Sequence, residues 1–280
     1  MEQFEYGKFI IDALDKAADI ALQYYQKVSG ISKADDNNQV LTKADLEIGQ
    51  YLIDRIQEQY KDHNIIDEEI GALANNSDYT WVVDPIDGTS NFAAGVPTYG
   101  IMLGLLIGNT PIAGGIVLPS FGKRIYVAEK GKGAFQNGTA LHVTEETSLR
   151  STLLAYGVDS HQDLSDLTYM ECTTLARIIQ KIRNLRMSNS AFDIAMVLEG
   201  RYSGCMNRSS KIWDNVAQHI LVEEAGGKYV DFKGNEISYS GALQRTKDNF
   251  EFIAIAPQFL EEVLEVVRTF NDTAQKTGQL

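Results

Sequence analysis

Two aspartates three residues apart, Asp84 and Asp87, are the residues of this chain best suited to chemistry. They follow residues 79–83, an apolar stretch that predicts a buried strand, and Gly88 and Thr89 come directly after them. Carboxylate oxygens are the ligands that a hard cation such as Mg²⁺ prefers. If a short helix begins at Gly88 and Thr89, its first backbone N–H groups point at an anion. The stretch therefore predicts a metal site beside a phosphate site.

The same residues are also good material for an ordinary turn. Pro85, Asp87 and Gly88 stand where a loop commonly has proline, aspartate and glycine. Taken alone, the stretch supports a turn and a site about equally. Whether the stretch is a turn or a site depends on the other acidic residues of the chain.

Acidic residues at three further places in the chain could complete such a site. Glu68 and Glu69 follow a short predicted strand, Asp45 begins a predicted helix, and Asp214 immediately precedes another. Taken singly, each has a structural explanation, since Asp45 and Asp214 are acceptable helix N-caps and the glutamates could face solvent. All of them lie at strand ends or helix starts, where the backbone holds a ligand stiffly. Together with the aspartate pair they favour a metal site.

Composition limits the function. The chain has 280 residues, enough for one large domain or two small ones, and its 25 basic and 38 acidic residues give a formal net charge of −13. A field of that sign disfavours nucleic acid and anionic membranes as partners, and it admits an anionic substrate only where bound cations reverse the charge locally. The two cysteines form no metal-ligand spacing, and the acidic N-terminus does not resemble a signal peptide. We expect a cytoplasmic protein.

The first half of the chain is predicted to be α+β. Apolar periodicity predicts helices over residues 4–28 and 43–60, separated by a polar loop at 32–39. After a short strand at 65–66, a loop at 71–79 and the strand that carries the aspartate pair, three further strands are joined by short turns. They cover residues 100–107, 111–118 and 124–129, and they predict an antiparallel meander, which the hairpin signal Asn137–Gly138 continues.

After about residue 147, strands and helices alternate, which is typical of an α/β arrangement. The expected strands and helices are strands at 153–156, 183–187, 202–206, 228–230 and 252–256, and helices at 167–181, 191–199, 216–225 and 257–270. We therefore predict an N-terminal α+β half, residues 1–146, that carries most of the acids, and a C-terminal α/β half, residues 147–280, that closes the site.

Two long motifs resemble those of one family. Residues 81–92, Trp-Val-Val-Asp-Pro-Ile-Asp-Gly-Thr-Ser-Asn-Phe, resemble the first signature of the inositol monophosphatase family of Mg²⁺-dependent, lithium-sensitive phosphatases. Residues 213–217, Trp-Asp-Asn-Val-Ala, followed by Glu-Ala-Gly-Gly at 224–227, resemble its second. Shorter matches at 41–45, 67–69, 131–138 and 186–191 extend the resemblance over most of the chain.

The resemblance implies a fold, a mechanism and a set of roles. The fold would be a layered αβαβα sandwich, usually dimeric, and the cofactor would be two or three Mg²⁺ ions. The metal ligands would be Glu68, Asp84, the carbonyl of Ile86, Asp87 and Asp214. Gly88 and Thr89 would bind phosphate, and Thr89 with Asp45 and Glu68 would activate the attacking water. Ser190 and Ala191 would lie beside the leaving group, with Asn207 and Arg208 as further substrate contacts.

The chain departs from the family pattern at several places. Asp67 replaces a usual glycine and could tighten a metal site or lie outside it, and Asn189 replaces another glycine. Gln39 replaces a usual acid, which puts the third metal in doubt unless Asp35 or Asp36 substitutes for it. Asn207 stands where inositol-phosphate enzymes often have an acid, and Arg208 and Lys211 follow. These basic residues could serve a more highly charged substrate or could be surface charges.

The leading hypothesis is a Mg²⁺-dependent phosphomonoesterase that hydrolyses a small polyol phosphate, inositol 1-phosphate first, by metal-activated water. Within the same class, 3′-phosphoadenosine phosphate, fructose 1,6-bisphosphate and NADP(H) are alternative substrates. A non-catalytic regulator that binds metal and phosphate is a second class, and a metal-dependent transferase is a third. The chain shows no dinucleotide or nucleotide-sugar motif that a transferase would need.

Overall fold

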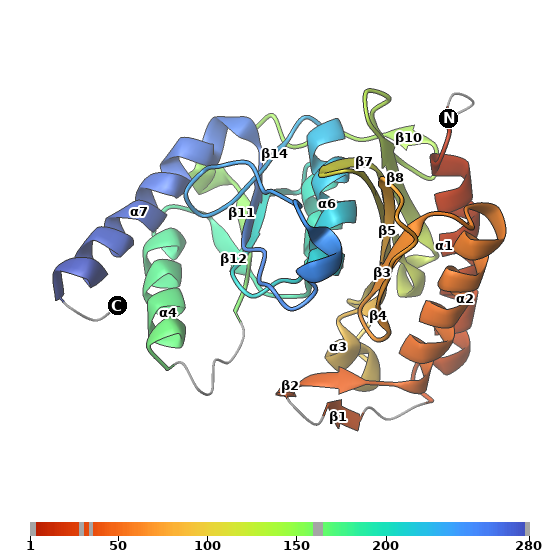
Figure 1. The fold of residues 1–280 in the computed structure, drawn as a ribbon. Coiled ribbons are helices and arrows are strands. Elements are labelled where there is room, and N and C mark those ends of the chain that lie inside the picture. The colour runs from red at the N-terminus through yellow and green to blue at the C-terminus, as the bar shows by residue number, and fades with distance from the viewer. Residues whose placement is uncertain (1–3, 28–30, 34–35, 159–164, 278–280) are drawn as a thin grey trace.

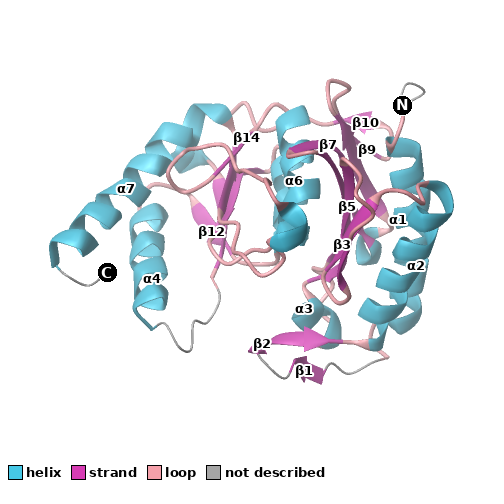
Figure 2. Cartoon of the chain, viewed as in Figure 1, coloured by secondary structure: helices cyan, strands magenta, loops and turns pink. Residues whose placement is uncertain are grey.

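The computed structural model describes residues 4–27, 31–33, 36–158 and 165–277. For residues 31–33, 36–40, 165–166 and 269–277 it describes only the backbone. The described chain forms two large β-sheets, with helices outside and between them, and one two-stranded sheet (Figures 1 and 2). No helix among these residues is long and apolar enough to cross a membrane.

The larger sheet has eight strands in the order β10-β9-β8-β7-β6-β5-β3-β4. Its strands are β3 (Asn64–Asp67), β4 (Gly71–Leu73), β5 (Tyr79–Asp87), β6 (Gly100–Ile107), β7 (Thr110–Leu118), β8 (Arg124–Glu129), β9 (Ala134–Gln136) and β10 (Thr139–Ala140). β6 to β8 form the predicted antiparallel meander, which β5 extends, and only β3 runs parallel to its neighbour β5. The short, apolar strands and tight turns of this stretch explain that topology, because antiparallel strands need only a short connection.

Both faces of the larger sheet are covered by helices. α1 (Gly7–Tyr24) lies against β7 and α2 (Lys43–Gln59) against β5, while α6 (Ile212–Glu224) lies against β6 and β7 on the other face. Neighbouring glycines in β7 show the two sides directly. A Cβ on Gly114 would meet Ala217 of α6, whereas one on Gly115 would meet Ile10 of α1. Because both faces are buried, β6 and β7 are almost continuously apolar.

The smaller sheet has five strands in the order β12-β11-β13-β15-β14. They are β11 (Leu153–Gly157), β12 (Asn184–Arg186), β13 (Tyr202–Asn207), β14 (Lys228–Val230) and β15 (Phe252–Ile255). β11, β12 and β13 are parallel, and β15 is antiparallel to both of its neighbours. The remaining elements are β1 (Ile31–Lys33), β2 (Asp36–Leu41), α3 (Thr89–Ala93), α4 (Ser165–Ile179), α5 (Ser190–Leu198), α7 (Leu260–Thr277), and 3₁₀ turns at Pro119–Phe121, Leu149–Ser151, Ala242–Gln244 and Pro257–Phe259.

The layers follow the order helix, sheet, helix, sheet, helix. α1 and α2 form the first layer, and α5 and α6, which contact each other, lie between the two sheets. α4 and α7 contact each other on the outer side of the smaller sheet. The layered αβαβα sandwich is therefore confirmed. One buried cluster joins Met102 and Ile116 of the larger sheet to Ile253 of the smaller one, so the two sheets share a core. The division at residues 146 and 147 stays a prediction.

Four predicted boundaries were wrong. The loop at 32–39 contains the hairpin β1–β2, and part of the loop at 71–79 is the edge strand β4. Both segments lack apolar alternation, so their strands are created by pairing, which at β4 is helped by the left-handed φ of +89° at Gly71. The helix predicted from 216 begins at Ile212, and the last helix continues to Thr277.

Candidate active site

Asp84 and Asp87 lie together because β5 is irregular at this point. In a regular strand, residues three apart point to opposite faces of the sheet. Between Asp84 and Asp87 the pairing of β5 with β6 shifts, so that Asp84 is opposite Met102 and Asp87 is opposite Gly100. Pro85 has no N–H for the ladder, which favours an interruption here. The bulge brings both carboxylates to one side.

Asp214 completes a cluster of three carboxylates. One oxygen of each of Asp84, Asp87 and Asp214 lies within 4.8 Å of the others. Asp214 is in the first turn of α6, where its Oδ2 accepts a hydrogen bond from the backbone N–H of Lys211. α6 can approach the sheet closely because Gly104 presents no side chain to it. A Cβ there would lie 2.7 Å from Val216 Cγ1.

The cluster has the electrostatics of a cation site. Asp84 is 1% exposed, and neither of its carboxylate oxygens has a hydrogen-bond partner among the described residues. Burial, and then repulsion by Glu68, Asp87 and Asp214, raises the pKa of Asp84 well above its usual range. Burial also raises the pKa of Asp87 to about 7, against the hydrogen bond from Ala191 N–H. Buried, orphaned carboxylate oxygens are costly without a positive partner, so these residues fit a divalent cation.

Glu68 and Asp67 have different positions. Glu68 lies just after β3, lines the same cleft and raises the pKa of both Asp84 and Asp87, although it is outside the cluster of three. Asp67 is fully buried, and its Oδ1 accepts the N–H groups of Glu69 and Ile70 at 2.9 Å each. It shapes the turn after β3 and does not line the cleft.

Asp45 and Thr89 form a hydrogen-bonded pair beside the cluster. Thr89 Oγ1 lies 3.0 Å from Asp45 Oδ1 and 2.9 Å from the carbonyl oxygen of Ile86. Asp45 Oδ2 accepts the backbone N–H of Thr42 at 2.8 Å, which closes the capping box of α2. Burial raises the pKa of Asp45. Neither Asp45 nor Asp214 is the N-cap residue of its helix, because each occupies the third helical position, where its carboxylate reaches back to the N-cap N–H.

Gly88 and Thr89 begin α3 as predicted, and both line the cleft. Gly88 has a left-handed φ of +85°, and a Cβ at this position would lie 2.6 Å from the side-chain Nδ2 of Asn189. Only glycine meets both demands. The side chain of Asn189 also hydrogen-bonds the Asp87 carboxyl.

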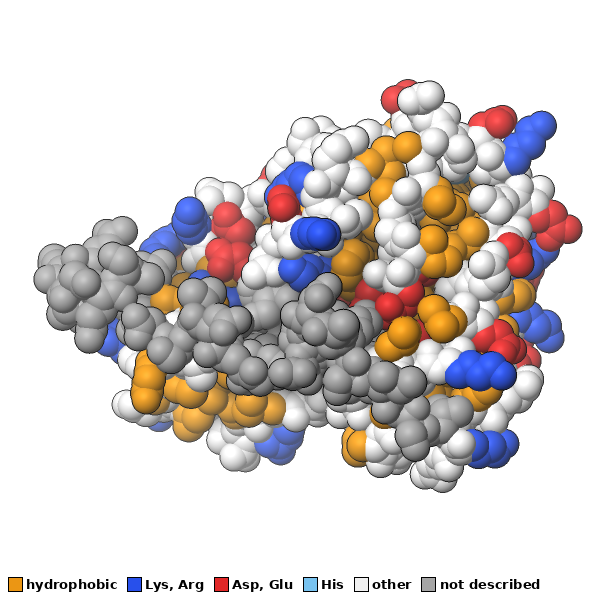
Figure 3. All heavy atoms as spheres, turned by 60° about the horizontal axis from the view of Figure 1, so that its bottom comes forward, with side chains coloured by type: hydrophobic (Ala, Val, Ile, Leu, Met, Phe, Trp, Pro, Cys, Tyr) orange, Lys and Arg blue, Asp and Glu red, His pale blue; other side chains and the backbone are white. Residues whose placement is uncertain are grey.

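These residues line one cleft of about 440 Å³. Figure 3 views the molecule from the side where α3 and β2 come forward, and it shows acidic side chains gathered in a hollow near the middle of that face. The lining residues come from both halves of the chain: Glu68, Asp87, Gly88, Thr89, Ser90, Asn91, Tyr156, Gly157, Val158, Met187, Ser188, Asn189, Ser190, Asp193, Cys205, Met206, Asn207, Ser209, Ser210 and Asp214. None of the described lining residues is lysine or arginine.

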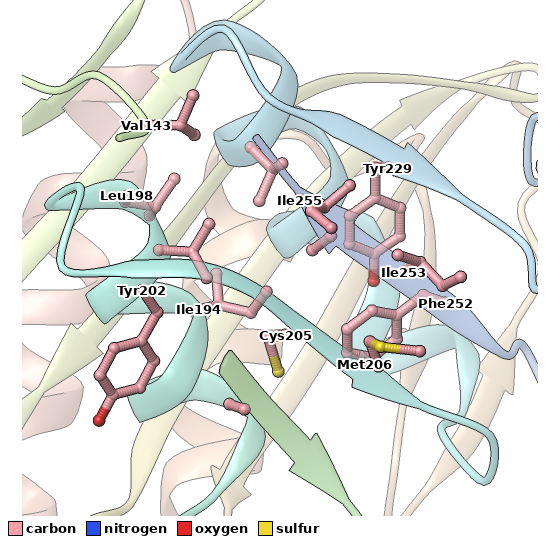
Figure 4. Packing of buried hydrophobic residues seen from close by; sticks show 14 of the residues in the cluster. Val143, Ile194, Leu198, Tyr202, Cys205, Met206, Tyr229, Phe252, Ile253 and Ile255 are labelled. Atoms are coloured by element: carbon pink, nitrogen blue, oxygen red, sulfur yellow. The ribbon is translucent and has the colours of Figure 1, made fainter. Parts of the chain in front are cut away.

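α5 brings Ser190 and Ala191 to this cleft. The N–H of Ala191 donates to Asp87 Oδ2 at 2.6 Å, and Ser190 is a lining residue. The helix is held by its apolar face, where Ile194 and Leu198 pack in the core with residues of β13 and β15 (Figure 4). The resemblance implies that both residues lie beside the leaving group of the substrate. Ser190 lines the cleft and Ala191 is buried next to it, and the role of the two residues stays a prediction.

Asn207 and Arg208 point in different directions. Asn207 lines the cleft, and its Oδ1 accepts the N–H of Ser209 at 2.7 Å. Arg208 is not a lining residue. Its guanidinium lies 3.9 Å from the centre of the Phe232 ring and pairs with Glu251 at 3.0 Å, and only 9% of its side chain is exposed. This placement does not favour the predicted contact between Arg208 and the substrate.

Sequence reasoning missed Asp193, which also lines the cleft. Its Oδ2 accepts the N–H groups of Ser188 and Asn189 at 3.2 and 3.3 Å, and burial raises its pKa to about 6. A single acid within the apolar run of the helix at 191–199 was the available signal. Gln218, one turn after Asp214, was also missed, and its available signal was likewise a polar residue within an apolar helix.

Two of the shorter motifs meet in space. Glu224, at the end of α6, accepts the N–H groups of Gly131 and Gly133 at 2.7 Å each. These bonds join the turn between β8 and β9 to the helix that carries Asp214. The motifs at 131–138 and 224–227 therefore form one structural contact between the halves.

Comparison with known proteins agrees with this geometry. The sequence model described as the inositol monophosphatase family matches residues 3–269. A protein of Aquifex aeolicus named fructose-1,6-bisphosphatase/inositol-1-monophosphatase is 32% identical over 204 residues, which cover 72% of this chain and 76% of the relative. A Nus factor SuhB of Pasteurella multocida is 31% identical over 264 residues, covering 92% and 94%.

The fold is also that of a solved structure. An IMPase of Thermotoga maritima superposes with a TM-score of 0.83 at 27% identity, covering 96% of this chain and 99% of that one. With two long motifs, a matching fold and an acidic cluster where the motifs meet, the chain belongs to the inositol monophosphatase family, whose members are phosphatases that hydrolyse phosphoric monoesters.

Proposed function

We propose that this phosphatase is Mg²⁺-dependent and hydrolyses the monophosphate of a small neutral polyol, with inositol 1-phosphate as the first choice. The observation that carries the proposal is the cleft itself. A cluster of three carboxylates, of which Asp84 has no hydrogen-bond partner among the described residues, lies at a wall of small polar residues. None of the described lining residues is basic.

The residues present fit the cation. Asp84, Asp87 and Asp214 would hold it, with Glu68 and the carbonyl of Ile86 as further oxygen ligands for a second or third ion. When bound, Mg²⁺ would neutralise phosphoryl oxygens, lower the pKa of water and stabilise the leaving alkoxide. This charge is necessary because the described cleft wall offers four carboxylates and no basic side chain to a substrate dianion.

The hydrogen bonds of the Asp45–Thr89 pair leave it able to accept a proton from water. The Thr89 hydroxyl donates toward Asp45 Oδ1 or the Ile86 carbonyl, so the lone pairs of its oxygen stay available to a water molecule in the cleft. Asp45 is held rigidly by Thr42 through the capping box. We infer that the pair orients the attacking water and helps to remove its proton.

The lack of basic lining residues favours a single phosphate. A second phosphate would need its own cation, and three basic residues stand next to lining residues in the sequence without lining the cleft themselves. Arg186 is exposed, and its Nη1 donates to Leu185 O at 2.7 Å. Arg208 pairs with Glu251, and Lys211 Nζ is bound to Lys247 O and Asn249 Oδ1 at 2.8 and 2.7 Å. Fructose 1,6-bisphosphate remains the second candidate because the Aquifex aeolicus relative carries that activity in its name.

A purely regulatory role is the alternative from another class, and one relative is named as a Nus factor. Binding of metal and phosphate would not require the hydrogen-bonded Asp45–Thr89 pair beside them. In this chain the two side chains are hydrogen-bonded to each other at 3.0 Å. We therefore favour catalysis.

Phosphate release from a panel of inositol 1-phosphate, fructose 1,6-bisphosphate, 3′-phosphoadenosine phosphate and NADP⁺ tests the proposal. We expect release with Mg²⁺, loss with chelator, inhibition by Li⁺, and the highest kcat/KM on the polyol monophosphate. Release that persists under chelation would refute the metal-dependent mechanism. The homodimer implied by the resemblance and the cytoplasmic location inferred from the composition stay predictions, and light scattering of the purified protein checks the first.

A further inference from the structure

Gln218 is a fully buried polar residue that the proposed mechanism does not use. It lies on α6 four residues after Asp214, which places both side chains on the same face of the helix. Its side-chain Nε2 donates to Ser190 Oγ at 2.6 Å and contacts the Met102 sulfur at 3.4 Å. The residue therefore connects the helix of the carboxylate cluster to the cleft wall.

This hydrogen bond determines whether the Ser190 hydroxyl acts as donor or acceptor toward Gln218. In this structure the Gln218 amide is oriented with Nε2 toward Ser190, and because an amide N–H can only donate, Ser190 Oγ accepts in this orientation. The proton of the Ser190 hydroxyl is then left to donate elsewhere, and no described residue accepts it. Because Ser190 lines the cleft, the available direction is toward a ligand.

The position of Ser190 indicates which part of a ligand it meets. The next residue, Ala191, donates its N–H to Asp87 Oδ2 at 2.6 Å, so Ser190 stands beside the carboxylate cluster. Asp45 and Thr89 are on α2 and α3 in the other half, whereas Ser190 is on α5 with the remaining lining residues of the C-terminal half. We place the Ser190 hydroxyl on the leaving-group side of the cleft.

Stability does not explain Gln218. Its side-chain Oε1 is buried and has no hydrogen-bond partner among the described atoms, which is an unfavourable arrangement in a protein core. Of its two neighbours on α6, Ala217 packs in the apolar core, whereas His219 is also buried and polar. The satisfied end of the Gln218 amide is Nε2, whose hydrogen bond reaches the cleft wall at Ser190.

We propose that Gln218 is a positioning residue that makes Ser190 a hydrogen-bond donor to a hydroxyl oxygen in the alcohol portion of the substrate. The inference rests on the proposed function and narrows its substrate class. The enzyme should select phosphate esters of alcohols that carry a second oxygen near the ester. Alcohols without such an oxygen leave the Ser190 proton unpaired.

The test compares two esters that differ only in ring hydroxyls, myo-inositol 1-phosphate and cyclohexyl phosphate, for the full chain in saturating Mg²⁺. The variants are Ser190→Ala, Gln218→Met, which is close in shape but has no N–H, and the double variant. The preference for the inositol ester, taken as the ratio of the two kcat/KM values, should fall about 3- to 10-fold in each single variant. The double variant should fall no further, because Gln218 acts through Ser190.

Met102→Leu is the matched control, since it removes the other contact of the Gln218 amide and conserves volume. In this variant the ratio of the two kcat/KM values should stay within about twofold of the wild-type ratio. Gln218→Asn, which withdraws the amide from Ser190 by one methylene, replaces Gln218→Met if that variant does not fold. The rise in Tm caused by Mg²⁺ with inorganic phosphate should persist in every variant.

Two results would overturn the inference. One is equal loss of kcat/KM on both esters, and the other is additive loss in the double variant. Both results are measured on a wild-type chain that releases phosphate. Failure of the proposed function is a different outcome, in which the wild-type chain releases no phosphate from any ester with Mg²⁺.

Discussion

At the scale of single residues, Asp84 is a buried carboxylate whose ionised form is electrostatically costly. Its side chain is buried, its two oxygens have no hydrogen-bond partner among the described residues, and neighbouring carboxylates raise its pKa. A residue in this state destabilises the chain unless a cation offsets the charge. Asp193 shares part of this cost, because burial raises its pKa to about 6.

Asp84→Asn should separate two effects of the carboxylate cluster, namely the destabilisation caused by charge repulsion and the stabilisation gained when Mg²⁺ binds. With chelator, the variant should have a higher Tm than the wild type, since one repelling charge is gone. With Mg²⁺ at 100 times its Kd the wild type should gain about 3 kcal/mol, and the variant much less. Differential scanning calorimetry checks both states, and Asp12→Asn, an exposed acid on α1, is the control. A wild type that gains nothing from Mg²⁺ would contradict the metal assignment.

Asp193→Asn should change stability only above a certain pH. The folded pKa of Asp193, about 6, lies above the unfolded value of 3.8, so the folded state holds its proton more tightly. The wild type therefore loses stability relative to the variant as the pH rises from about 4 to 6, by up to about 3 kcal/mol. Urea unfolding at pH 4 and pH 8, with chelator, measures the difference. Equal differences at the two pH values would show that the charge is not responsible.

At the scale of elements, helix ends are completed by residues distant in sequence. The N-cap residue of α1, Tyr6, makes no side-chain cap. The backbone N–H groups of Glu5, Tyr6 and Gly7 donate instead to the carboxylate of Glu129, at the end of β8. The helix dipole and three donors favour the ionised form, and the pKa of Glu129 is lowered by Lys132 and by these bonds against the effect of burial. This contact joins the first layer to the sheet.

Glu129→Ala should destabilise the chain by about 2 kcal/mol because three N–H groups lose their acceptor. Activity should be unaffected, since Glu129 does not line the cleft. The folded pKa is below the unfolded one, so this stabilisation is present above pH 4.5 and lost as the pH falls further. Chemical unfolding at pH 7 and pH 3.5 measures it, with Glu58→Ala on the exposed face of α2 as control. A loss that is equal at both pH values would refute the assignment.

At the scale of the whole molecule, the site exists because two halves share a core. Asp84 and Asp87 come from a sheet, and Asp214 from a helix more than a hundred residues later. The glycines at 104 and 114 allow that helix to lie directly on the sheet, and Glu224 fastens its other end to the turn after β8. The distance between α6 and β6 thus determines whether the three carboxylates can bind one cation.

Gly104→Ala should weaken both stability and metal binding. The new Cβ would lie 2.7 Å from Val216 Cγ1 and 2.9 Å from Ala217 N, so α6 must move away from the sheet. We expect a loss of about 1–3 kcal/mol in unfolding free energy and a several-fold rise in the Mg²⁺ concentration for half-maximal activity. Adding Val216→Ala should restore part of both. Unchanged Mg²⁺ dependence in Gly104→Ala would show that the α6–sheet distance is not limiting.

Much of this architecture could be predicted from local patterns. The meander of β6 to β8, the helices α1 and α2, and the start of α3 at Gly88 and Thr89 all have sufficient periodicity or turn chemistry of their own. The segments that could not be predicted, β1, β2 and β4, have no such pattern, and they become strands only because a partner supplies their hydrogen bonds. The departures at Gln39 and Asp35 fall where side chains are not described.

The sequence by itself determined which chemistry is available. The types of Asp45, Glu68, Asp84, Asp87, Thr89 and Asp214 specify oxygen ligands and a phosphate turn, because ligand preference is a property of the side chain. Only the tertiary structure decided what those side chains meet. A bulge puts Asp84 and Asp87 on one face, which strand periodicity alone would forbid, and burial turns Arg208 onto Phe232 and away from the cleft. Direction and burial depend on neighbours that lie far away in the chain, so no local pattern contains them.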